Sequence, residues 1–146
     1  MQRWDGWITG LEAQADFSLI CWVEYFYLEA LRNGATGCIG GGGNTHPELI
    51  YAVQDHFLAG RQAEAEKAQA DLNRTRKIFG RLSHAMSGIQ YMVRRGAALE
   101  PRVRTGGGPY REQFARSGPY PPEVMDPLAA QLDALLRPYR KVYGIA

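Results

Sequence analysis

The sequence is poor in the residues that mark disulfide-rich and metal-binding proteins. Its 146 residues include only two cysteines, Cys21 and Cys38, and their spacing fits no zinc or redox motif. Both lie in apolar segments, so we expect reduced thiols in the core of a cytoplasmic protein. Neither a metal site nor a cofactor is expected.

Long apolar runs and an excess of one charge are also missing. The longest apolar runs fall far short of the ~20 residues that a membrane-spanning helix needs, and residues 1–10 lack the pattern of a signal peptide. The formal net charge is only +2, and basic and acidic residues alternate from Arg61 to Lys77. The basic residues Arg137, Arg140 and Lys141 suit a solvated helix end. We therefore expect no membrane and no nucleic-acid partner.

What the chain does have is glycine, concentrated in the segment NGATGCIGGGGNTHPE from Asn33 to Glu48. Gly34 can adopt the left-handed conformation that ends a helix. Residues 36–40 are too short for a helix and predict a buried strand. The four glycines at 40–43 let the backbone approach a ligand closely. The segment therefore predicts a strand, a glycine loop and then a helix.

The helix after the glycine loop has its own start pattern. Thr45 and Glu48 have the spacing of a capping box, and Pro47 falls in the first turn. A helix N-terminus that faces a glycine loop favours an anionic or hydroxyl-rich ligand. The alternative is a tight turn without a ligand. Neither a dinucleotide fingerprint nor a P-loop fits these residues.

Apolar periodicity predicts an α/β chain with a helical tail. The last helix places Val124, Leu128, Leu132, Leu135 and Leu136 on one face. Two parallel strands joined by one helix cannot protect both faces and both edges of a sheet, so we expect the chain to be part of something larger. The predicted strands lie near 17–22 and 36–40, the predicted helices at 1–16, 24–33, 46–59, 61–79, 87–95 and 123–142, and a loop at 100–122.

Several short motifs, in order, resemble the C-terminal half of the dihydrodipicolinate synthase and N-acetylneuraminate lyase family. In that family, the end of strand seven precedes the isoleucine of a Gly-Ala-x-Gly-x-Ile-Ser strand by seventeen residues. Trp22 and Ile39 keep this spacing. Trp22 stands where the family usually has glycine, Gly40 where many members have serine, and Gln90 where lysine is common. The matching segments are residues 21–24, 34–40, 44–48, 59–68, 89–96 and 103–104.

The resemblance implies the last two strands of a (β/α)8 TIM barrel over residues 1–60 and a C-terminal helical region over 61–146. Members of the family are Schiff-base aldolases or lyases that act on pyruvate or another 2-oxo acid and an aldehyde or sugar acid. The family's catalytic lysine ends strand six, which would fall upstream of Met1. We therefore expect a C-terminal fragment without catalytic residues, inactive when isolated. The resemblance implies a substrate-binding set of Trp22, Glu24, Tyr25, Ile39, Gly40 and Gly41.

Two of the polar residues near this site have competing interpretations. Glu24 either accepts hydrogen bonds from substrate hydroxyls or caps the helix that it opens. His46 either transfers protons or is a polar residue at a helix start. The lysines Lys67, Lys77 and Lys141 are expected to be surface charges, because a reactive lysine needs a desolvated pocket.

Three functions follow from these patterns. The first is an incomplete Schiff-base aldolase or lyase. The second is a non-catalytic helical interaction module that self-associates or binds a full-length paralogue, using the aromatic residues at 22–28. The third is an anion-binding module built on the glycine loop. The first two predict a homo-oligomer or a larger assembly.

Overall fold

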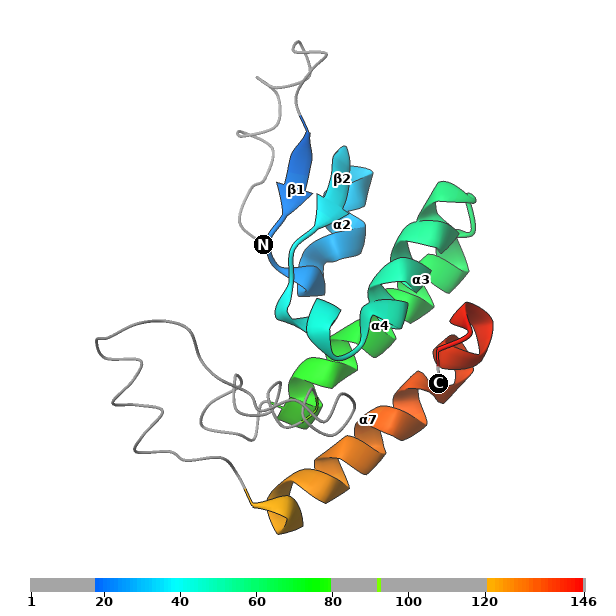
Figure 1. The fold of residues 1–146 in the computed structure, drawn as a ribbon. Helices are drawn as coiled ribbons and strands as arrows, with labels where there is room; N and C mark the ends of the chain where they lie inside the picture. Colours follow the sequence, from blue (N-terminus) through cyan, green and yellow to red (C-terminus); the bar gives the residue numbers. More distant parts are fainter. Residues whose placement is uncertain (1–17, 80–91, 93–120, 146) are drawn as a thin grey trace, which may run out of the picture.

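The computed structural model describes residues 18–79, 92 and 121–145. The expected helix over 1–16 lies outside these residues. The expected helix over 87–95 also lies outside them, except for residue 92. Of the expected loop at 100–122, only the last two residues are described. The described chain is mostly helical and carries one two-stranded parallel sheet (Figure 1). None of its described helices has the length and apolar character needed to cross a membrane.

The sheet pairs β1 (Leu19–Cys21) with β2 (Ala35–Cys38) in parallel, as the sequence predicts. The chain between the strands forms a short 3-10 helix, η1 (Glu24–Phe26), and then α2 (Tyr27–Arg32), where the sequence predicted a single helix. Gly34 ends this crossover with φ 87°, which confirms its left-handed conformation. The crossover helix is what allows two strands so close in sequence to run parallel.

The two faces of the sheet have different surroundings. Cys21 and Ala35 are buried in the core with Tyr27 of α2. The side chain of Ile20 lies over Gly37. A Cβ atom added to Gly37 would be only 3.3 Å from Ile20 Cδ1. Ile20, Gly37 and Ile39 form what we call the open sheet face, on which Ile20 is 45% and Ile39 66% exposed. No described helix covers this face.

The aromatic run after β1 is only partly buried. Tyr27 and Leu28 lie in the core, but Phe26 is 53% exposed. Phe26 lies at the break between η1 and α2. Leu28 faces inward, and its backbone N–H donates to Gln69 Oε1 over 2.8 Å.

The helical part forms a layer beside the sheet (Figure 1). It contains the 3-10 helix η2 (Gly41–Asn44), α3 (Pro47–Leu58), α4 (Gln62–Phe79) and α7 (Pro122–Tyr143). These helices confirm the predictions at 46–59, 61–79 and 123–142 within a few residues. α7 packs on both α3 and α4. It buries Met125, Leu128, Leu132 and Leu136, whereas Val124 is exposed because Met125 takes the inward place in the first turn.

A buried ion pair joins the start of α3 to the end of α7. Glu48 is 1% exposed and accepts a hydrogen bond from Arg140 Nε at 2.8 Å, and Arg140 also bonds Asp133 at 3.1 Å. The predicted capping box is therefore wrong, because Glu48 turns to Arg140 and the helix has no side-chain cap. The prediction of a solvated helix end is wrong for Arg140. A buried carboxylate needs such a partner, since an unpaired one is very costly.

Two tyrosines of α7 offer a matched test of the helix contacts. Tyr139 Oη donates to Asp71 of α4 at 2.6 Å in the interior, whereas Tyr143 Oη donates to Asp55 of α3 at 2.8 Å near the surface. Tyr139→Phe should lower the free energy of unfolding by about 1–2 kcal/mol and Tyr143→Phe by less than about 0.5 kcal/mol, because only the first of the two hydrogen bonds is buried. Urea unfolding of both variants measures this, and equal losses would contradict the assignment.

Candidate functional site

The candidate site lies where both strands end and the glycine loop begins. Trp22 follows β1 and is 80% exposed, and Ile39 follows β2 on the open sheet face. Glu24 and Tyr25 belong to η1, while Gly40 and Gly41 enter η2. The structure thus brings the predicted residues together at the carboxyl ends of the two strands. Ligands bind at this end of the sheet in parallel α/β proteins.

Glu24 makes a contact that neither of its predicted roles describes. Its side chain is buried, and Oε1 accepts a hydrogen bond from the Gly42 N–H at 3.1 Å. A Cβ atom on Gly40 would collide with the same carboxylate. The close approach of Glu24 therefore favours glycine at residue 40. Glu24 fixes the glycine loop from inside the protein.

Helix α4 holds Glu24 from the other side. Gln69 Nε2 donates to the Glu24 backbone carbonyl at 3.1 Å, and Gln69 Oε1 accepts from the Leu28 N–H at 2.8 Å. One amide side chain thus bonds both the start of η1 and the start of α2. This contact fixes the turn that carries Glu24 and Tyr25.

His46 is buried between the glycine loop and α4. It is 3% exposed, with Nδ1 at 2.7 Å from Thr45 Oγ1 and Nε2 at 3.3 Å from Thr75 Oγ1. A Cβ atom on Gly42 would also collide with Nε2. Burial lowers the pKa of His46 to about 4, so its imidazole is neutral near pH 7. His46 therefore connects the loop, α3 and α4 as an uncharged group.

The N-terminus of α3 is less open to an anion than the sequence suggested. The Gly42 carbonyl accepts hydrogen bonds from the Thr45 N–H at 3.0 Å and from the His46 N–H at 2.7 Å. Pro47, the first residue of the helix, has no N–H. The loop itself therefore occupies the two N–H groups that immediately precede the helix, so neither is free for an anion.

Tyr25 marks the side of the site next to α4. Its ring lies under the guanidinium of Arg76, with 5.3 Å from Arg76 Cζ to the ring centroid. Burial, and next the charge of Glu24, raise the pKa of Tyr25. Arg76 is exposed. The phenol therefore stays protonated, with a cation over its face.

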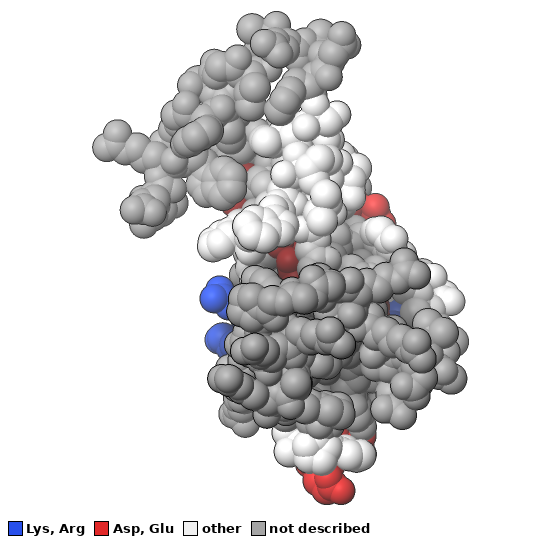
Figure 2. Space-filling view, turned by 60° about the vertical axis from the view of Figure 1, so that its left-hand side comes forward, with Lys and Arg blue, Asp and Glu red and all other residues white. Residues whose placement is uncertain are grey.

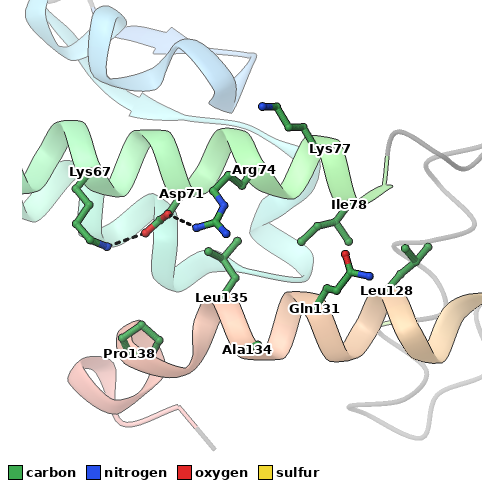
Figure 3. A pocket seen from close by; sticks show the side chains of 10 residues that line it. All are labelled: Lys67, Asp71, Arg74, Lys77, Ile78, Leu128, Gln131, Ala134, Leu135 and Pro138. Atoms are coloured by element: carbon green, nitrogen blue, oxygen red, sulfur yellow. Dashed lines mark hydrogen bonds and ion pairs between the residues drawn. The ribbon is translucent and has the colours of Figure 1, made fainter.

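A second concave region is the groove of about 710 Å³ between α4 and α7 (Figure 3). Asp71 lies in it and binds Lys67 at 2.8 Å and Arg74 at 3.1 Å. Figure 3 draws Lys77 on the side of α4 that is turned away from α7. Sequence reasoning missed this cluster, although the spacing of Lys67, Asp71 and Arg74 is that of neighbours on one helix face.

The groove does not supply a reactive amine. The hydrogen bond to Asp71, followed by one to Tyr139, raises the pKa of Lys67, so its ammonium is held in the protonated form. A Schiff-base lysine needs the opposite, a neutral amine in a desolvated pocket. Across the part of the chain that the structure describes, no three His, Cys, Asp or Glu side chains are grouped so that they could hold a metal ion.

Little charge is seen on the described surface in Figure 2. Most of the visible described residues are uncharged, with Lys or Arg side chains projecting at one margin and acidic ones at the lower tip.

Comparison of the chain with protein-family models, curated proteins and solved structures gave no match.

The neutral state of His46 predicts a pH dependence of stability. An unfolded histidine binds a proton near pH 6.5, but the folded one does so only near pH 4. Stability is therefore full above the unfolded pKa and is lost as the pH falls from about 6.5 towards 4. We expect the free energy of unfolding to drop by about 2 kcal/mol between pH 7 and pH 5 on account of this residue.

The control for this measurement is His46→Gln, which keeps a polar side chain but cannot titrate. Urea unfolding at pH 7 and pH 5 should show a smaller pH-dependent loss in this variant than in the wild type. All other titrating groups are the same in both proteins. An equal loss in both would mean that His46 is not held neutral.

Proposed function

We propose that this chain is the C-terminal part of a (β/α)8 barrel in the dihydrodipicolinate synthase and N-acetylneuraminate lyase family, whose members make or break carbon–carbon bonds through a Schiff base. One observation carries the proposal. The parallel unit β1, α2 and β2 buries one apolar face and leaves the other open, with a glycine loop at the carboxyl ends of its strands.

The open sheet face supports the barrel. In a (β/α)8 barrel, helices cover the outside of each strand, and side chains from other strands fill the inside. Cys21 and Ala35 are buried, as residues on the outside of a barrel strand are beneath the covering helices. Ile20 and Ile39 are apolar but exposed. Residues on the inside of a barrel strand would be exposed in the same way if the other strands were absent. Further strands on both sides would also pair the edges of β1 and β2.

The position of the glycine loop supports a substrate site. Catalytic residues in such barrels lie at the carboxyl ends of the strands, where Trp22, Tyr25 and Gly41 are found. In the proposed site the backbone of Ile39 and Gly40 borders the pyruvate end, and Trp22, Tyr25 and Gly41 face the aldehyde or sugar acid. Glu24 acts through Gly42, by fixing the loop.

The reaction needs an amine from elsewhere in the barrel. A lysine amine condenses with the carbonyl of a 2-oxo acid and loses water to give an iminium. In cleavage the iminium accepts the electron pair of the carbon–carbon bond that breaks. In synthesis it first loses a proton to become an enamine, whose carbon attacks the carbonyl of the aldehyde. Lys67 is held by Asp71 on an outer helix, and Lys141 is exposed on α7. The proposal therefore places the reacting lysine on a strand outside these 146 residues.

Borohydride trapping tests the proposed function. The 146-residue chain, and the same chain extended by the reading frame upstream of Met1, are each treated with pyruvate and sodium borohydride. We expect the extended protein to gain one reduced pyruvyl group on an upstream lysine, and the short chain to gain none. Intact mass and peptide mapping locate the label. An unlabelled extended protein, or a label on Lys67, Lys77 or Lys141, would contradict the proposal.

Two glycine variants of the extended protein control for the loop. Gly42→Ala should reduce trapping, because the added Cβ would meet His46 and Glu24, whereas Gly43→Ala should not, because its Cβ would meet no atom within 4 Å. Circular dichroism confirms that both variants remain helical. Equal trapping by the two variants would mean that the loop does not shape the site.

A second candidate function is a non-catalytic module that self-associates, and the exposed apolar side chains Trp22, Phe26 and Ile39 favour it. Light scattering distinguishes this function from the first. If it is correct, the 146-residue chain forms a defined dimer or higher oligomer, and Trp22→Ser weakens the assembly at least tenfold while the exposed control Tyr51→Ser does not. A monomer at micromolar concentration would exclude self-association as the function.

A further inference from the structure

The two cysteines of the chain lie directly opposite each other in the sheet. Cys21 ends β1, Cys38 ends β2, and the parallel register pairs them. Neighbouring strands are about 4.8 Å apart, which falls within the range of about 4.4–6.8 Å between Cα atoms that a disulfide spans. Both side chains are on the covered face, and the sequence contains no other cysteine.

The Cys21 thiol also has a defined direction. Cys21 Sγ donates a hydrogen bond to the Val23 carbonyl at 3.2 Å. Cys38 packs against the same core cluster that contains Cys21. Register and packing therefore place both side chains on one face of the sheet, at directly opposed positions.

The contact of Cys21 with Val23 links this pair to the glycine loop. Val23 immediately precedes η1, whose first residue, Glu24, accepts the hydrogen bond from Gly42. A disulfide has no S–H donor, so its formation would remove the hydrogen bond to the Val23 carbonyl. The junction that positions Glu24 would then lose one of its supports.

We propose that Cys21 and Cys38 form a redox-sensitive dithiol that closes to a disulfide when a small-molecule disulfide such as oxidised glutathione is the oxidant, and that this closure loosens the glycine loop. The thiolate of Cys38 attacks one sulfur of oxidised glutathione and releases one glutathione thiolate. The thiolate of Cys21 then attacks the Cys38 sulfur and releases the second. Two protein thiols are oxidised, and one small disulfide is reduced to two thiols.

The order of these steps follows from exposure. Cys38 is half-buried, whereas Cys21 is 5% exposed, so the bulky reagent reaches Cys38 first. Burial raises the pKa of Cys38 to about 12, and the thiolate is the reacting form. Closure is therefore slow near neutral pH and accelerates as the pH rises.

Mass spectrometry of the folded 146-residue chain tests the proposal. The chain is incubated with oxidised glutathione at pH 7 and pH 9, quenched with acid and digested without a reductant. We expect an intact mass lower by two hydrogens, a peptide pair joined through Cys21 and Cys38, and a rate at least tenfold higher at pH 9. Hydrogen exchange at residues 40–43 should be faster in the oxidised form than in the reduced form.

Single variants separate the two steps. Cys21→Ala should stop at a stable mixed disulfide on Cys38, and Cys38→Ala should remain largely unmodified, because Cys21 is buried. Glutathione on both cysteines of the wild type, or linkage only in urea, would overturn the dithiol pair. Unchanged exchange at residues 40–43 after oxidation would overturn its effect on the loop.

Discussion

The hydrogen bond from the Gly42 N–H to the Glu24 carboxylate is the contact on which the arrangement of the strand ends depends. It joins the segment after β1 to the segment after β2, and it does so in the interior, where a carboxylate without partners is very unfavourable. The loop accommodates this carboxylate because residue 40 lacks a side chain. His46 occupies the space beside Gly42, where a Cβ atom would collide with it, and contacts α4 through Thr75. A buried acid and a buried imidazole together account for glycine at residues 40 and 42.

Most described elements could be predicted from the sequence, because local signals and burial agree there. Gly34 and Gly60 end helices with positive φ, and the apolar spacing of α7 corresponds to its buried side. The failures occurred where a distant partner decided the conformation. Thr45 and Glu48 have the spacing of a capping box, but Arg140, far along the chain, draws Glu48 away. Val124 looked equivalent to Leu128, but the neighbouring Met125 faces the core.

The candidate site was predictable in position but not in chemistry. The glycine run and the strand pattern indicated the end of the sheet that carries the loop, and the family resemblance implied Trp22, Glu24 and Gly40 as site residues. The pattern did not show that Glu24 points into the protein, because the direction of a side chain depends on the two elements that meet around it. The network of His46 with Thr75 was also unpredictable, since it joins two helices whose packing no local signal specifies. The family resemblance to an aldolase is still a prediction.

The ion pair between Glu48 and Arg140 has a consequence for the order in which the molecule folds. Its partners are 92 residues apart in the chain, whereas α3 and α4 are separated by a short turn at Gly60. Closing a long loop carries a larger entropic penalty than closing a short one, and contacts between distant segments form later than local ones. The hairpin of α3 and α4 can therefore assemble first and present Glu48 at its open end. Docking of α7 would then follow the hairpin, with the carboxylate solvated until Arg140 arrives.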